Sequence, residues 1–213
     1  INFKDLDIIY HYSLYHQFSK NKSVSYSNLL NFLDKCNRYS KNEVLIVSGS
    51  KKRNNFEVVD ILNDLKFDLS KDFKFGIAYN PYFRENSLQI LERQRLLSKL
   101  NSGFIKSIWL QFGSDLYALE NQLSFLDNNF NFSSDIENSV KIYGSVFIPS
   151  KQFLARFKFR PWRGVFLSND YLNSIDKSID ITKGLLSIYL KNNIFPLIET
   201  ECSSNKQLNE VKK

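Results

Sequence analysis

Several polar side chains lie at or near the ends of apolar stretches of the sequence, and Gln111, within the predicted strand Ser107–Phe112, is the clearest. An amide in apolar surroundings must find buried hydrogen-bond partners or face a ligand, and it can pair with the edge of a flat heterocycle. Further candidates stand where other apolar runs end: His11, Tyr12, Ser48, Gly49, Ser50, Tyr79, Asn80, Gly144, Ser145, Glu199 and Glu201. We expect a binding or catalytic site among these ends.

Structural explanations compete at most of these positions. His11 lies between tyrosines and is typical of a hydrogen-bonded packing residue, while Tyr79 and Trp109 are typical of core aromatics. The chain has no nucleophile elbow, zinc motif, Walker loop or paired-carboxylate signature. With two histidines in the chain, no metal site is expected. Little in this set is a strong catalyst.

The same pattern repeats along the chain: an apolar strand, a polar end, and an amphipathic helix. Phe73–Phe83 is the clearest strand and corner, with its tip at Tyr79. Helices are predicted at 26–39 with Ser25 as cap, and at 56–65, 87–101, 116–126, 151–157 and 181–190. Residues 159–174 break the rhythm and fit a loop leading into a short helix, and 203–213 fits a closing helix.

The spacing of the strand ends predicts parallel strands. The ends recur roughly every 30 to 35 residues, apart from a longer last gap, and this is the period of a βαβ unit. An open doubly wound sheet usually carries GxGxxG after its first strand, and this chain has none. The alternative, a (β/α)8 TIM barrel, typically needs about 250 residues and eight units, of which six are visible.

Composition bounds the partners of this chain. Its 213 residues, 43% of them hydrophobic, can bury one sizeable core, and a net charge of +7 suits an acidic ligand. The charges are scattered, so nucleic acid is not expected as a partner. Cys36 and Cys202 have no paired spacing, which fits a reducing, cytoplasmic compartment, and no apolar run is long enough to span a membrane.

In sequence order, the phrases YHYSL, VLIVSGS, FGIAYNPYF, SIWLQFGSD and IYGSVFIPS resemble the strand ends of methylenetetrahydrofolate reductases. The most specific part is Lys99, followed by Gly103 four residues later and by Gln111 on the next strand. The resemblance implies an α/β fold, a single (β/α)8 TIM barrel domain over residues 1–213 that is N-terminally incomplete and starts near the third strand. It also implies reduction of 5,10-methylenetetrahydrofolate to 5-methyltetrahydrofolate by NAD(P)H, through FAD or by direct hydride transfer.

The resemblance also assigns residues to roles. Those that match substrate-binding positions are Gln111, Tyr171 and Tyr79. Those that match cofactor-binding positions are His11, Ser48, Ser50, Tyr79, Glu92 and Lys99. The family's general acid, a glutamate on the first strand, would lie upstream of Ile1, so no catalytic residue is assigned within the chain. Whether Glu199 or Glu201 replaces that acid stays open.

Two departures from the family pattern concern the cofactor. Ser48–Ser50 stands where the family has Arg-Gly-Asp, and Asn80–Phe83 replaces Pro-Glu-x-His. A flavin-free branch would explain both losses, and FRPWRGVFLS resembles that branch. Two alternatives remain: a non-catalytic barrel that binds a folate, a pterin or a protein partner, and a different barrel enzyme acting on an anionic metabolite. Either a monomer or a homo-oligomer is compatible with the sequence.

Overall fold

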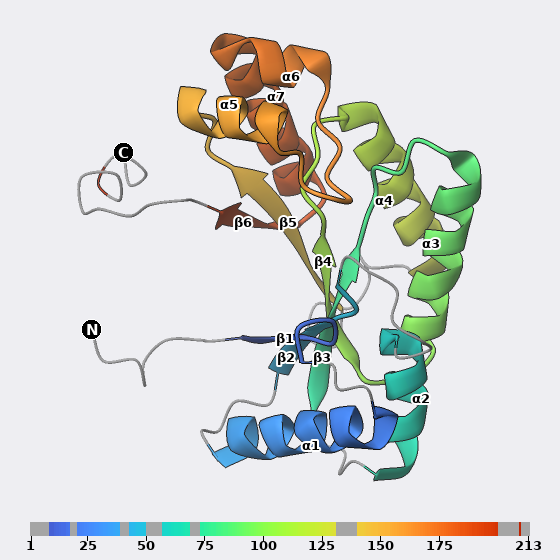
Figure 1. Ribbon diagram of the computed structural model, residues 1–213. Coiled ribbons are helices and arrows are strands. Elements are labelled where there is room, and N and C mark those ends of the chain that lie inside the picture. The colour runs from blue at the N-terminus through green and yellow to red at the C-terminus, as the bar shows by residue number, and fades with distance from the viewer. Residues whose placement is uncertain are drawn as a thin grey trace. The chain divides into compact units, whose positions relative to one another are not determined.

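The computed structural model describes residues 9–17, 21–38, 43–49, 57–68, 73–130, 140–199 and 209, and strands alternate with helices along them (Figure 1). The elements are β1 (Tyr10–Ser13), α1 (Lys22–Arg38), β2 (Glu43–Val47), α2 (Val58–Asp68), β3 (Lys74–Tyr79), α3 (Asn86–Leu100), β4 (Ile105–Leu110), α4 (Leu116–Phe130), β5 (Lys141–Phe147), α5 (Lys151–Phe159), α6 (Asn169–Asn173), α7 (Ile175–Lys191) and β6 (Phe195–Glu199). The pairs β1–β2, β2–β3 and β5–β6 are parallel, as the βαβ spacing predicts.

The predicted closed eight-stranded barrel is wrong. Across the described residues the sheet has six strands in the order β1-β2-β3-β4-β5-β6, with β1 and β6 at its two ends. The fold is therefore an open α/β sheet. Consecutive βαβ units dictate that neighbouring strands are parallel, but closure also requires a matching number, tilt and stagger of strands. Repeat spacing carries no information on those quantities.

The chain divides into two compact units, while the prediction of a single domain stays a prediction. Unit 1 comprises Ile1–Tyr79 and Ile90–Ile108, and unit 2 comprises Asn80–Gln89 and Trp109–Lys213. Each unit has buried side chains of its own. Within the described ranges, no helix is both long and apolar enough to cross a bilayer.

In unit 1, the core contains alternate residues of β2 and the residues along one face of α1. Val44 and Ile46 alternate with less buried residues in β2 and are fully buried. Helix α1 buries Leu29, Leu33 and Cys36, which recur at intervals of three and four residues along one face. The apolar run at 44–47 and the helical spacing in α1 are both visible in the sequence, so β2 and most of α1 are predicted correctly.

Two helices begin earlier than predicted. Helix α1 starts at Lys22, because Asn21 accepts a hydrogen bond from the Ser23 backbone N–H at 2.9 Å and so caps the helix. The predicted cap, Ser25, is instead buried inside α1, and its hydroxyl donates to the Asn21 carbonyl at 3.2 Å. Helix α7 starts at Ile175 and not at 181, after the N-cap Ser174.

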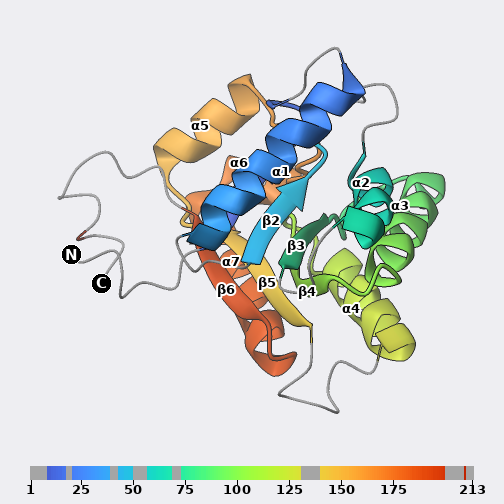
Figure 2. The same cartoon turned by 90° about the horizontal axis from the view of Figure 1, so that it is seen from below.

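Unit 2 is built from β5, β6 and the helices α4 to α7, and Figure 2 shows β5 and β6 side by side. Helix α7 reaches β5 through Gly144, where a Cβ atom would lie 2.4 Å from the ring of Tyr189. The Tyr189 hydroxyl donates to the Ser145 carbonyl at 3.2 Å. The predicted loop and short helix near residue 169 are confirmed as α6. The predicted closing helix at 203–213 lies outside the described residues, apart from Asn209.

Candidate functional site

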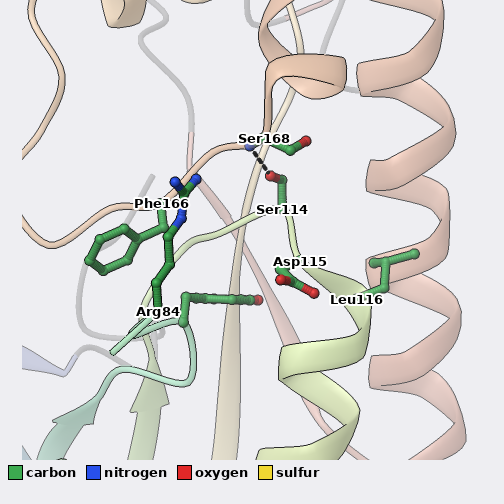
Figure 3. Close-up of a pocket in the computed structure, with 7 residues that line it drawn as sticks. Arg84, Ser114, Asp115, Leu116, Phe166 and Ser168 are labelled. Atoms are coloured by element: carbon green, nitrogen blue, oxygen red, sulfur yellow. Dashed lines mark hydrogen bonds between the residues drawn. The ribbon is translucent and has the colours of Figure 1, made fainter. Parts of the chain in front are cut away.

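A pocket of about 230 Å³ lies in unit 2, next to residues that follow the carboxyl end of β4 (Figure 3). Three segments line it: the corner after β3, the turn between β4 and α4, and the segment between α5 and α6. The lining residues are Tyr82, Arg84, Ser114, Asp115, Leu116, Phe166 and Ser168. In open α/β sheets, ligands bind outside the carboxyl ends of the strands. This pocket is therefore a candidate site.

Asn80 ties the first of these segments to the third. Its Nδ2 donates to the Gly164 carbonyl at 2.8 Å, and its Oδ1 accepts from the Tyr82 backbone N–H at 3.0 Å. Asn80 itself is 8% exposed, and its bond to the Tyr82 N–H is buried while its bond to Gly164 is part-buried. The Phe83 and Phe166 rings also meet edge to face, with centroids 5.8 Å apart. The Asn80 amide thus joins the corner after β3 to the segment between α5 and α6, two of the walls of the pocket.

Ser114 ties the turn after β4 to the same third segment. Its Oγ accepts from the Ser168 backbone N–H at 2.7 Å, which Figure 3 marks, and its own N–H donates to the Phe166 carbonyl at 3.2 Å. The Ser168 Oγ in turn accepts from the Tyr171 N–H at 3.1 Å and caps α6. These hydrogen bonds therefore hold the turn after β4 and the segment before α6 together at the pocket.

Tyr82 lies on the backbone of Gly113. A Cβ atom at Gly113 would be 2.3 Å from the nearest Tyr82 ring carbon, so no other residue fits there without moving the ring. Burial, and next the nearby Tyr189, raise the pKa of Tyr82 well above its ordinary value. Tyr82 therefore stays uncharged near neutral pH, and it contributes an aromatic ring and a protonated hydroxyl to the pocket lining.

Asp115 and Arg84 bring charges of both signs to the pocket, and both are exposed to solvent. The Asp115 Oδ1 accepts from the Ala118 N–H at 2.9 Å, which caps the first turn of α4. An Asp at a helix N-terminus is also favoured by the helix dipole. A carboxylate oxygen can accept more than one hydrogen bond, so Asp115 can also accept from a ligand.

Two of the predicted substrate-binding residues, Gln111 and Tyr171, both contact Phe112. The Gln111 Oε1 accepts from the Phe112 N–H at 3.0 Å, and its Nε2 has no hydrogen-bond partner within the described ranges. The Tyr171 ring meets the Phe112 ring edge to face at 5.9 Å. Tyr171 is fully buried, and this burial raises its pKa to about 12. Neither Gln111 nor Tyr171 lines the pocket, and their roles stay predictions.

Tyr79, predicted for both substrate and cofactor, belongs to unit 1 and is 1% exposed. His11 is exposed at the start of β1, and partial desolvation, with a smaller contribution from His16, lowers its pKa. Ser50 lies outside the described residues. These three assignments stay predictions.

Ser48 and Lys99, also predicted for the cofactor, make contacts within unit 1. The Ser48 Oγ accepts from the Val58 N–H at 3.3 Å, at the start of α2. The Lys99 Nζ donates to the Ala78 carbonyl at 3.1 Å, and burial lowers its pKa against the opposing effect of Glu92. Both groups therefore make contacts within the protein, and their cofactor roles stay predictions.

The pocket residues themselves were not predicted as a site. Ser114 and Asp115 follow the predicted strand that contains Gln111, and their place directly after a strand is the sequence signal that could have identified them. Phe166 and Ser168 carry no such signal, because they lie in the segment that breaks the strand and helix rhythm. The contact between Asn80 and Gly164 joins positions 84 residues apart.

No family model and no curated protein matches the sequence. Solved structures do match, and one of them is an uncharacterized protein from Clostridium thermocellum, described as binding two copies of 5-methyl-5,6,7,8-tetrahydrofolic acid. The match has a TM-score of 0.52 and 12% sequence identity, and it covers 94% of this chain and 90% of that chain. At this identity, the likeness establishes a shared fold.

Proposed function

We propose that this protein binds a reduced folate without transforming it. The observation that carries the proposal is the fold shared over 94% of the chain with a protein described as binding 5-methyltetrahydrofolate. The sequence resemblance to folate enzymes supports the same ligand class independently of that comparison. A binding role also agrees with the weak catalytic character of the side chains at the strand ends.

The pocket in unit 2 supplies groups that suit a pterin ring. A pterin is flat and carries N–H donors along its pyrimidine edge, and a carboxylate such as Asp115 can accept from them. The rings of Tyr82 and Phe166 offer apolar faces, and the pocket also presents the Ser114 and Ser168 hydroxyls. We assign the pyrimidine edge of the pterin to Asp115.

Calorimetric titration with 5-methyltetrahydrofolate tests this assignment through Asp115→Asn. Asn also caps helices well, so the variant keeps the start of α4 while it removes the charge that accepts from the ligand. We expect binding to weaken about 10-fold, the usual effect of losing one charge-assisted hydrogen bond.

Asp127→Asn is the matched control, because it removes the same charge from an exposed position on the same helix. We expect its affinity to equal that of the unchanged protein. Equal affinities for both variants would overturn the role of Asp115, and no binding by the unchanged protein would overturn the proposed function.

We also propose reduction of 5,10-methylenetetrahydrofolate by NAD(P)H as a second candidate function. It is supported by Gln111, whose amide nitrogen is left without a described partner beyond the end of β4. In such a reaction the methylene carbon gains a hydride from NAD(P)H, its bond to N10 breaks, and N10 takes a proton, which leaves the methyl group on N5. Oxidation of NAD(P)H in the presence of this folate, with and without FAD, tests it. Turnover would favour this function over binding alone.

A further inference from the structure

Cations gather on the segment that leads from α5 into the pocket wall. The sequence has no acidic residue between Glu137 and Asp170. The six cations in this interval are Lys141, Lys151, Arg156, Lys158, Arg160 and Arg163. The last three are exposed and fall within six positions of one another at the end of α5 and just beyond it. We call Lys158, Arg160 and Arg163 the basic segment.

The protein itself leaves the charges of the basic segment unused. No carboxylate in the described part of the chain forms an ion pair with Lys158, Arg160 or Arg163, whereas Lys177 pairs with Asp170 at 2.8 Å. The helix dipole favours Lys158 in the last turn of α5 and Arg160 at its C-cap, but Arg163 lies three residues beyond the cap. Stabilisation of the helix therefore does not explain the whole cluster.

The backbone of the basic segment is fixed on both sides of Arg163. The Trp162 ring packs against Phe147, with the centroids 5.1 Å apart, and the Gly164 carbonyl accepts from Asn80. Arg163 is only three residues before Phe166, which lines the pocket, so their Cα atoms are at most about 11 Å apart. A ligand that leaves the pocket can therefore reach the cations of this segment.

The size of the pocket requires part of a folate to lie outside it. Pockets that enclose drug-sized ligands measure roughly 300 to 1,000 Å³, and this one measures about 230 Å³. The pterin ring can occupy it, while the benzoyl group and the glutamate tail extend into solvent. The tail carries only negative charges, and the basic segment on this wall is positive.

We propose that the basic segment binds the poly-γ-glutamate tail of the reduced folate whose pterin occupies the pocket. This inference rests on the proposed function and adds the form of the ligand, a polyglutamate. Each exposed ion pair strengthens binding roughly 1.5- to 5-fold, so three pairs together give about a 10-fold gain. The gain shrinks with salt, because the Debye length falls from about 14 Å to about 4 Å between about 0.05 M and 0.5 M salt.

The experiment compares 5-methyltetrahydrofolate monoglutamate with its pentaglutamate by calorimetry, at low and high salt. In the unchanged protein we expect the pentaglutamate to bind about 10-fold more tightly at low salt. The triple variant Lys158→Glu, Arg160→Glu and Arg163→Glu is expected to lose that gain while its affinity for the monoglutamate changes less than about twofold. Thermal unfolding checks that each variant is folded.

The control reverses three exposed lysines elsewhere in unit 2, with Lys141→Glu, Lys183→Glu and Lys191→Glu, and so changes the net charge equally. We expect this variant to keep the gain at low salt. Loss of the gain in both variants would mean that net charge alone attracts the tail, and would overturn the assignment.

Three further outcomes separate the alternatives. Equal affinities of the unchanged protein for the two folates would overturn the tail site and leave the proposed function intact. If neither folate binds, both proposals fail. Cations interleaved with Phe159, which is 91% exposed, also resemble surfaces that bind single-stranded nucleic acid. An oligothymidylate that binds more tightly than the pentaglutamate, and that the basic-segment variant no longer binds, would overturn the tail site in favour of nucleic acid.

Discussion

Replacing Asn80 by Ala should loosen the pocket, because this one amide joins two of its walls. The substitution removes the donor to the Gly164 carbonyl and the acceptor for the Tyr82 N–H. Leaving a buried polar group without its partner costs about 1 to 3 kcal/mol. Tyr82 is 2% exposed and Gly164 is half-buried, so we expect the free energy of unfolding to fall by about 2 to 4 kcal/mol.

Two further variants calibrate this value in urea unfolding, where the midpoint reports the stability and the slope reports the surface exposed. Asn80→Asp keeps the acceptor for the Tyr82 N–H but turns a carboxylate oxygen toward the Gly164 carbonyl at a buried position, so we expect a loss at least as large as that of Asn80→Ala. Asn129→Ala also removes an amide that donates to a backbone carbonyl, that of Phe125 at 2.8 Å, but on the exposed side of α4. We expect a change within about 0.5 kcal/mol there.

The same samples report on the site itself. Because Tyr82 and Phe166 face the pocket from the two walls that Asn80 joins, Asn80→Ala should also bind 5-methyltetrahydrofolate more weakly than Asn129→Ala does. If Asn80→Ala were as stable as Asn129→Ala, the account of these walls as a hydrogen-bonded unit would be refuted.

Gly113→Ala places a Cβ atom 2.3 Å from the Tyr82 ring and should destabilise the protein by about 1 to 3 kcal/mol in urea unfolding. Gly184→Ala is the matched control: its Cβ meets only the flexible end of Leu116 and Ala favours the helix, so equal losses in both would contradict the steric argument. The raised pKa of Tyr171, about 12, predicts a loss of stability in alkali. The folded state keeps this proton while the unfolded chain releases it near pH 10, so the contribution is complete below pH 10 and falls by about 2.7 kcal/mol as the pH rises to 12. Unfolding of Tyr171→Phe over this range should show a correspondingly smaller decline, and an identical decline would contradict the assignment.

The alternation of strands and helices could be predicted because each element carries its own local signal. The short apolar run at 44–47 marks a strand, and the spacing of Leu29 and Leu33 marks the face of a helix. Helix starts are predicted less accurately, since the cap of α1 is Asn21, four residues before the predicted cap Ser25. Closure of the sheet could not be predicted, because strand tilt and stagger leave no local pattern.

The site could be predicted only in part, for a related reason. Gln111 stands out because an amide lies near the end of an apolar run, and Asp115 lies four residues further along the same segment. Phe166 reaches the pocket through tertiary contacts, among them the bond from Asn80 to Gly164 and the bond from the Ser114 N–H to the Phe166 carbonyl, which no short-range pattern signals. The local sequence therefore identified the end of β4 as part of a site. The wall that contains Phe166 could not be identified, because it is formed by tertiary contacts.

A crystal structure of the protein with 5-methyltetrahydrofolate tests the central claim most directly. We predict electron density for the pterin in the pocket of unit 2, with its pyrimidine edge at hydrogen-bond distance from the Asp115 carboxylate. Density for the pterin at another place, with this pocket empty, would contradict the account.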